Sequence, residues 1–109
     1  MTKAGTAEPV LDASSAETAS ELFTLLSSPV RVLILMLLAD SDRRVHELVD
    51  YLDMSQPRVS QHLRILRNRG VVRAQREGRE VIYSLRDRHL ADLIRSAVAH
   101  LEVTGTDRS

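Results

Sequence analysis

Apolar positions recur at helical spacing in successive stretches of the chain before Gly70. A first helix is predicted from the positions Ala16, Ala19, Leu22, Phe23 and Leu26. A break at residues 27–29 follows, where Ser28 can cap a second helix and Pro29 suits its first position. This second helix covers about residues 29–39 and is apolar on nearly every side, so we expect it to be the most buried element.

Two shorter helices follow a polar connection at residues 40–44. The apolar positions of the third helix are Val45, Leu48, Val49 and Leu52. It ends at Asp53, and after a short turn Ser55 can cap a fourth helix that ends at Gly70. The apolar face of the fourth helix is formed by Val59, Leu63 and Leu66. Two short helices joined by a tight turn predict a helix-turn-helix unit.

The pattern becomes that of β-strands after Gly70. Residues 71–75 and 80–84 are two β-rich runs, and residues 76–79 place Gly78 at the bend of a hairpin with a charged tip. Asp87 can cap a last helix over about residues 88–103, with the apolar stripe Leu90, Leu93, Ile94, Ala97 and Leu101. The order α-α-α-α-β-β-α predicts a mainly α fold with a small β-hairpin, a winged helix-turn-helix.

Length and composition limit the organisation of the chain. We expect one domain over residues 13–103, between a disordered N-terminal tail at 1–12 and a flexible tail at 104–109. A chain this short hides only about two-thirds of its unfolded surface, so we expect extra burial in a dimer. We place the dimer contact on the terminal helices. There is no cysteine, so any metal must bind His, Asp or Glu. Neither a signal peptide nor a membrane-spanning run is evident, which favours a cytoplasmic protein with no membrane partner.

The charge is balanced overall but concentrated in one segment. Basic and acidic residues each number 15, yet the segment 55–79 contains seven arginines and one acidic residue, which gives it a net charge of +6. A basic segment in a balanced chain is typical of a local phosphate-binding surface. The alternative is a solvated charged face without a partner.

Several sequence runs occur together in this order: SPVR at 28–31, VHEL at 45–48, SQPRVSQHL at 55–63, GVV at 70–72 and REGREVIYSL at 76–85. In this combination the chain resembles the ArsR/SmtB family of metal-sensing transcriptional repressors of prokaryotes. The resemblance extends from about Ala16 to Leu101. It implies a homodimer that holds double-stranded operator DNA when it is free of ligand and releases the DNA when metal binds.

Candidate DNA-binding residues lie on the fourth helix and the hairpin tip. Side chains at the start of a recognition helix read base edges, and the resemblance implies that role for Gln56, Ser60 and Gln61. The full candidate set is Gln56, Arg58, Ser60, Gln61, Arg64, Arg76 and Arg79. Arg64, Arg67 and Arg69 suit phosphates or a solvated face, whereas Arg76 and Arg79 can reach phosphates or the minor groove. His62 is interpreted as a core histidine and His46 as structural.

A second group of candidates, Asp87, His89 and His100, has the chemistry of a metal site. The spacing from His89 to His100 is close to a whole number of helical turns, so both point from the same side of one helix. The helical rise separates them by about 16 Å, whereas zinc–nitrogen bonds are about 2.0 Å long. They therefore cannot share a metal within one chain. Antiparallel pairing of the helix with its twin would join the Asp87–His89 end of one chain to His100 of the other, in two symmetric sites.

The resemblance implies a zinc site of this kind between the C-terminal helices of two protomers. The family commonly places its fourth ligand, Glu or His, three residues after the second histidine, where this sequence has Val103. Glu102 is the nearest substitute, but it points about 220° around the helix from His89. A three-ligand site with water, Glu102 from a loosened last turn, or Asp107 from the tail remain open. The candidate metal ligands are Asp87, His89, His100 and Glu102, for Zn²⁺ with Co²⁺ or Ni²⁺ as alternatives.

The function that we predict is a homodimeric repressor that binds operator DNA when metal-free and is released by zinc. One alternative is a similar DNA-binding regulator that responds to a non-metal signal or to none. Another is a protein-interaction module, which the basic segment disfavours. We expect no enzyme and no small organic substrate, because the chain has no Ser/His/Asp spacing, phosphate-cradling glycine loop or close carboxylate pair that would support catalysis.

Overall fold

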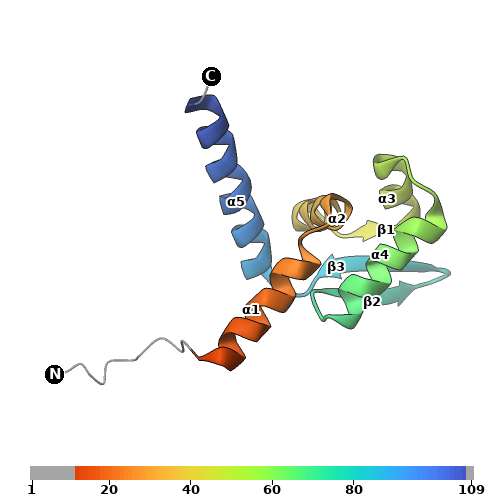
Figure 1. The fold of residues 1–109 in the computed structure, drawn as a ribbon. Coiled ribbons are helices and arrows are strands. Elements are labelled where there is room, and N and C mark those ends of the chain that lie inside the picture. The colour runs from red at the N-terminus through yellow and green to blue at the C-terminus, as the bar shows by residue number, and fades with distance from the viewer. Residues whose placement is uncertain (1–11, 108–109) are drawn as a thin grey trace.

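The computed structural model describes residues 12–107, with side chains through Glu102. Its order is α1 (Ala13–Leu25), α2 (Pro29–Asp40), β1 (Arg43–Arg44), α3 (Val45–Leu52), α4 (Gln56–Asn68), β2 (Val72–Glu77), β3 (Glu80–Leu85) and α5 (Arg88–Asp107). Figure 1 shows α2, α3 and α4 gathered beside the sheet, while α1 and α5 extend from one side of this body. The predicted winged helix-turn-helix is confirmed, with β1 as an additional strand. The predicted tail at residues 1–12 lies almost entirely outside the described residues.

The helix starts use the predicted caps. The Ser28 hydroxyl accepts a hydrogen bond from the Arg31 N–H at 3.2 Å, with Pro29 in the first turn of α2. The Ser55 hydroxyl likewise accepts from the Arg58 N–H at 3.4 Å at the start of α4. Such caps satisfy N–H groups that have no partner within the helix. They set the boundaries of α2 and of the recognition-type helix α4.

The core is centred on α2, as predicted from its apolar character. Ile34, Leu35 and Leu38 are essentially inaccessible to solvent. They belong to one cluster with buried residues of α1, α3, α4, β2 and α5: Leu25, Leu48, Val59, Leu63, Leu66, Val72, Leu90 and Ile94. The helix-turn-helix and the start of α5 therefore share one core with α2.

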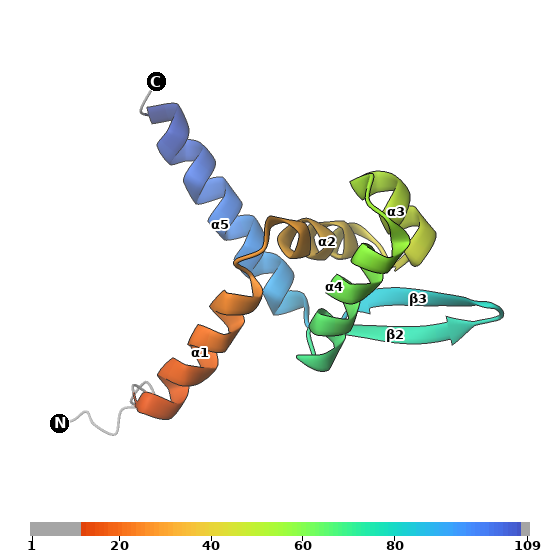
Figure 2. The ribbon, with the colours of Figure 1, turned by 45° about the vertical axis from the view of Figure 1, so that its right-hand side comes forward.

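The sheet has three antiparallel strands in the order β1-β3-β2. β1 lies within the predicted polar connection and pairs Arg43 with Tyr83 and Arg44 with Ile82. The hairpin turn is shorter than the predicted bend at residues 76–79, because β2 and β3 remain paired up to Glu77 and Glu80. Gly78 in the two-residue turn has φ +64°, a conformation that favours glycine. The hairpin tip points away from α1 and α5 in both views (Figures 1 and 2).

The terminal helices project from the body of the molecule (Figure 2). The radius of gyration is 17.2 Å, whereas a compact chain of this length has roughly 13 Å. α5 continues to Asp107, beyond the predicted end at Val103. Within residues 12–107 no single helix is long and apolar enough to span a membrane; α1 and α2 meet that test only as a pair bent by 91°.

The burial pattern of α2 predicts which leucine supports the core. Leu35 is 0 % exposed, whereas Leu33 on the same helix is 37 % exposed. We expect Leu35→Ala to lower the free energy of unfolding by about 2–5 kcal/mol, because it leaves a cavity in the core. Leu33→Ala should cost clearly less. Urea unfolding of both variants, followed by circular dichroism at one protein concentration, checks this. Equal losses would contradict the assignment of Leu35 to the core.

Candidate DNA interface and metal-ligand cluster

The helix-turn-helix is held together by local hydrogen bonds and by its buried face. The Arg44 N–H donates to the Glu47 carboxylate at 2.7 Å at the start of α3, and this bond is the main reason that the pKa of Glu47 is lowered. α3 ends at Asp53, which has φ +54° and donates its N–H to the Val49 carbonyl at 2.9 Å. The left-handed residue turns the chain so that α4 begins shortly afterwards, at Gln56.

The apolar face of α4 is fully buried, so its polar residues face outward. Val59, Leu63 and Leu66 are each 0 % exposed. Of the predicted DNA contacts on this helix, Ser60 is half-buried and the others are exposed: Gln56, Arg58, Gln61 and Arg64. All five side chains are therefore at least partly accessible on the outside of α4. Their contact with DNA stays a prediction.

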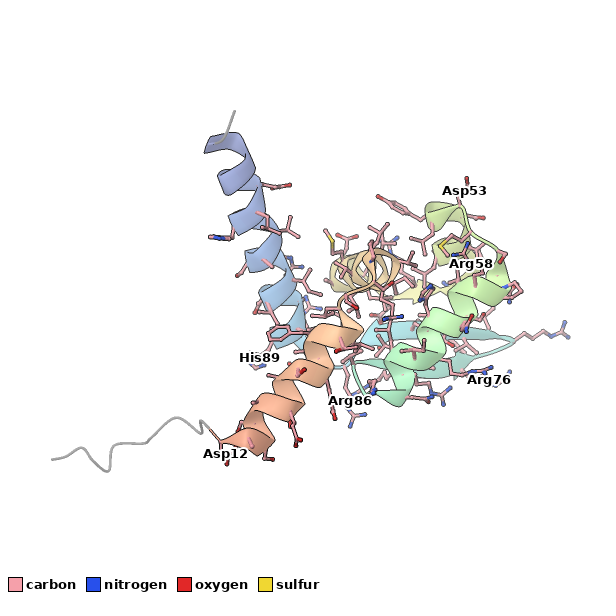
Figure 3. The ribbon with its side chains drawn as sticks, in the orientation of Figure 1. Asp12, Asp53, Arg58, Arg76, Arg86 and His89 are labelled. Atoms are coloured by element: carbon pink, nitrogen blue, oxygen red, sulfur yellow. The ribbon has the colours of Figure 1, made fainter. Side chains whose placement is uncertain are left out.

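The two predicted wing arginines lie at the hairpin. Arg76 is an exposed residue of β2, and Arg79 is exposed in the turn. Figure 3 shows Arg76 on the side of the molecule remote from His89. Arg76 of the wing and Arg58 of α4 thus both lie on the part of the molecule away from the start of α5 (Figure 3).

Arg44 connects the wing to the helix-turn-helix, a role that the sequence analysis missed. Its guanidinium lies 3.3 Å from Glu77 and also pairs with Glu80, so it partly neutralises both wing carboxylates. Its backbone pairs with β3 and caps α3. No local sequence signal identifies this residue, because its partners on the wing lie far along the chain. Arg44 therefore leaves Arg76 and Arg79 as the predominant charges of the wing tip.

The two other histidines differ in environment. His62 is half-buried at the margin of the core rather than inside it, a partial correction to the prediction. Its Nδ1 lies 3.5 Å from an Arg31 guanidinium nitrogen. Burial, followed by the charges of Arg31 and Arg58, lowers the pKa of His62 and favours the neutral imidazole. His46 is exposed at the start of α3.

Asp87 and His89 form a pair at the start of α5. The Asp87 carboxylate accepts a hydrogen bond from the His89 N–H at 2.9 Å, which confirms its predicted capping role. The same oxygen lies 2.9 Å from His89 Nδ1. Both side chains are largely exposed, and Figure 3 shows His89 at the base of α5 beside α1. The pair presents oxygen and nitrogen donors together at an accessible position.

The other predicted metal ligands are on the distant half of α5. His100 and Glu102 are both exposed, and the helical rise places His100 about 16 Å along the axis from His89. Among the side chains that the structure describes, no three His, Cys, Asp or Glu groups lie close enough to hold a metal within this chain. The side chains of Val103 and Asp107 lie outside the described part. The structure thus brings Asp87 and His89 together and leaves His100 apart.

Known proteins match this chain in sequence and in fold. The family profile described as bacterial regulatory protein, arsR family, matches residues 28–74. The HTH-type transcriptional regulator NmtR of Mycobacterium tuberculosis is 38 % identical over 92 residues, a match that covers 84 % of this chain and 77 % of NmtR. The chain belongs to the ArsR family. This family consists of bacterial regulatory proteins, which confirms the expectation that the chain is not an enzyme.

Two further known proteins are similar to this ArsR-family chain, one in sequence and one in structure. The HTH-type transcriptional repressor SmtB of M. tuberculosis is 54 % identical over 84 residues, which cover 77 % of this chain but only 62 % of SmtB. The chain thus spans less than two thirds of the length of that relative. The crystal structure of M. tuberculosis Rv0081 has a TM-score of 0.80 at 35 % identity and covers 89 % of this chain and 98 % of that one.

The Asp87–His89 contact predicts an unusual titration. The His89 backbone N–H, followed by its ring, lowers the pKa of Asp87. A lowered pKa stabilises the start of α5 above the pKa of the unfolded chain, and this stabilisation is lost as the pH falls through the folded value. We expect His89→Ala to raise the pKa only part of the way, because the backbone N–H remains. Carbon-13 NMR titration of the Asp87 carboxyl checks this. An ordinary aspartate pKa in the unmodified protein would contradict the contact.

Proposed function

We propose that this chain is a transcriptional repressor that binds operator DNA as a homodimer and is released by zinc or a similar divalent metal. The observation that carries DNA binding is the outward polar face of α4, opposite a fully buried face. Amides and hydroxyls near the start of a recognition helix read base edges in the major groove. Gln56, Ser60 and Gln61 supply these groups in the ArsR-family chain.

Phosphate binding by the surrounding arginines supports the same function. Arg58 and Arg64 flank the base-reading residues of α4, and Arg76 and Arg79 extend the positive surface onto the wing. Positive side chains on both elements can follow the DNA backbone on either side of the groove that α4 enters. Such a regulator acts in the cytoplasm, where its operator lies.

The homodimer is supported by apolar surface on the projecting helices. Phe23 of α1 is 61 % exposed, and Leu93 and Leu101 of α5 are 44 % and 66 % exposed. Large apolar side chains grouped on projecting elements are typical of a surface that another molecule covers. A second copy covers them symmetrically when the terminal helices pair. Pairing also gives two copies of α4 that can bind two half-sites of an operator.

The same pairing completes the metal site. Asp87 and His89 lie together at one end of α5, and His100 lies toward the other end on the same helical side. Antiparallel α5 helices therefore place His100 of each protomer opposite the Asp87–His89 pair of its twin. The imidazole and carboxylate donors suit Zn²⁺, and also Co²⁺ or Ni²⁺. Val103 offers no donor at the position that the family commonly uses for its fourth ligand, so water, Glu102 or Asp107 completes the site.

A second candidate is an ArsR-type regulator that responds to a non-metal signal or to none. Two observations favour it: the Asp87 carboxylate already serves as a helix cap, and Val103 replaces the usual fourth ligand. In that case the histidines of α5 only support the dimer. Equilibrium dialysis against zinc separates the two candidates, because tight stoichiometric binding by the dimer would exclude the second.

Release by metal is the first expected outcome. Fluorescence anisotropy of the DNA upstream of the protein's own gene should report tight binding in chelator. Saturating zinc should weaken this binding at least about fivefold, because the two ligands are coupled by about 1–3 kcal/mol or more. Affinity that zinc leaves unchanged would support the second candidate. No binding to duplex DNA under either condition would refute both.

His100 provides the matching variant experiment. His100→Ala removes the ligand contributed by the partner protomer, so we expect normal DNA affinity in chelator and no release by zinc. His46→Ala serves as the control, because His46 lies on α3, far along the chain from the α5 cluster, and this variant should keep the zinc response. The same anisotropy titration measures both. A His100→Ala protein that zinc still releases would exclude His100 as a ligand.

A further inference from the structure

A polar cleft lies between α4 and the sheet. Its volume is about 480 Å³, and its walls are formed by Ser60, Arg64, Arg67, Asn68 and Tyr83. Four of these residues come from α4 at spacings of three and four, so they lie along one side of that helix. Tyr83 comes from β3 and faces them across the cleft. The cleft therefore joins the recognition helix to the wing sheet.

Both walls of the cleft are held in place by the fold. α4 is anchored by its fully buried apolar face. Tyr83 is half-buried against the core, and its backbone is paired with Arg43 of β1 and with Ala74 of β2. Groups on regular, packed elements keep their geometry better than groups on loops. The core and the sheet thus fix the backbone positions that carry the side chains of the cleft.

Every side chain in the cleft wall can donate a hydrogen bond, and no carboxylate lines it. Two of the five residues are arginines, which carry guanidinium groups. Within the part of the chain that the structure describes, neither Arg64 nor Arg67 forms an ion pair with Asp or Glu. Arg69, the residue that directly follows α4, differs, since its guanidinium lies 3.6 Å from the Glu21 carboxylate. The cleft therefore has an uncompensated positive charge and is suited to an oxyanion.

We propose that this cleft binds a phosphate of the DNA backbone and so sets the position of α4 along the groove. The inference rests on the proposed DNA-binding function. It adds Asn68 and Tyr83 to the contacts and assigns Arg67, which the sequence left between phosphates and a solvated face, to one phosphate. Arg67 pairs with the phosphate charge and the Tyr83 hydroxyl donates to a phosphate oxygen. Because the contact is to the backbone, it adds affinity on every sequence and fixes register without reading a base.

Charge removal at Arg67 gives the first test. The affinity of the full-length protein for a random duplex and for the DNA upstream of its gene is measured by anisotropy over a range of salt concentrations. Arg67→Gln should lower the slope of log K against log salt by about one for each bound protomer, with similar loss on both DNAs. Arg69→Gln is the matched control. Arg69 lies outside the cleft and its charge is paired with Glu21, so this variant should keep the slope.

Removal of the Tyr83 hydroxyl gives the second test. Tyr83→Phe keeps the ring that packs against the core but loses the donor, so thermal unfolding should be unchanged. Affinity for both DNAs should fall about fivefold to tenfold, with no change in the salt slope. A duplex with a single neutral methylphosphonate, moved position by position, then locates the contact. At one phosphate position in each half-site, the methylphosphonate should weaken binding by the unmodified protein. At that same position it should not weaken binding by Arg67→Gln any further.

The outcomes separate this proposal from the proposed function. If the unmodified protein binds both duplexes and Arg67→Gln retains the full salt slope, DNA binding stands and the phosphate cleft is wrong. If Arg69→Gln and Arg67→Gln lower the slope equally, the effect is general charge rather than the cleft, which also overturns the proposal. If the unmodified protein binds neither duplex, both proposals fail together.

Discussion

The burial of one face of α4 is the constraint on which the rest of the structure depends. Val59, Leu63 and Leu66 contribute no exposed surface and join α4 to the core built around α2. Because an α-helix has a fixed number of residues per turn, fixing these three also fixes the direction of every other side chain on the helix. The surface with Gln61 and the cleft side with Arg67 are both consequences of this packing. A regulator can vary those outward residues with little effect on its core.

Elements that depend on local periodicity and caps could be predicted from the sequence. Ser28 and Ser55 cap helices as expected, because capping involves residues only a few positions apart. β1 could not be predicted, since two residues show no alternation and the strand exists only through its pairing with β3. The wing contacts of Arg44 and the place of Tyr83 opposite α4 were missed for the same reason. Their partners are distant in the sequence and meet only in the folded chain.

The metal-ligand cluster also has one part that local sequence predicts and one part that it does not. Asp87 and His89 are neighbours at one helix start, so their contact follows from local geometry. His100 is on the same helical side but far along the axis, and its relation to the pair depends on a second copy of the chain. One chain offers donors at both ends of α5 without bringing them together. In the proposed dimer, dimerisation and metal binding are therefore coupled, and each should strengthen the other.

The fold also explains how a ligand at the start of α5 can influence α4. The Val71 N–H donates to the Leu66 carbonyl of α4 at 3.1 Å, and the Arg86 N–H donates to the Val71 carbonyl at 3.0 Å. Asp87 follows directly. Hydrogen bonds thus connect the last turns of α4 to the residue before the candidate ligand, through the base of the wing. In the proposed dimer, a metal that bridges two protomers at Asp87 would constrain the angle between the paired α5 helices. Because α4 is joined to this junction, the same constraint would act on the distance between the two copies of α4. Binding to an operator requires that distance to match the spacing of the two half-sites.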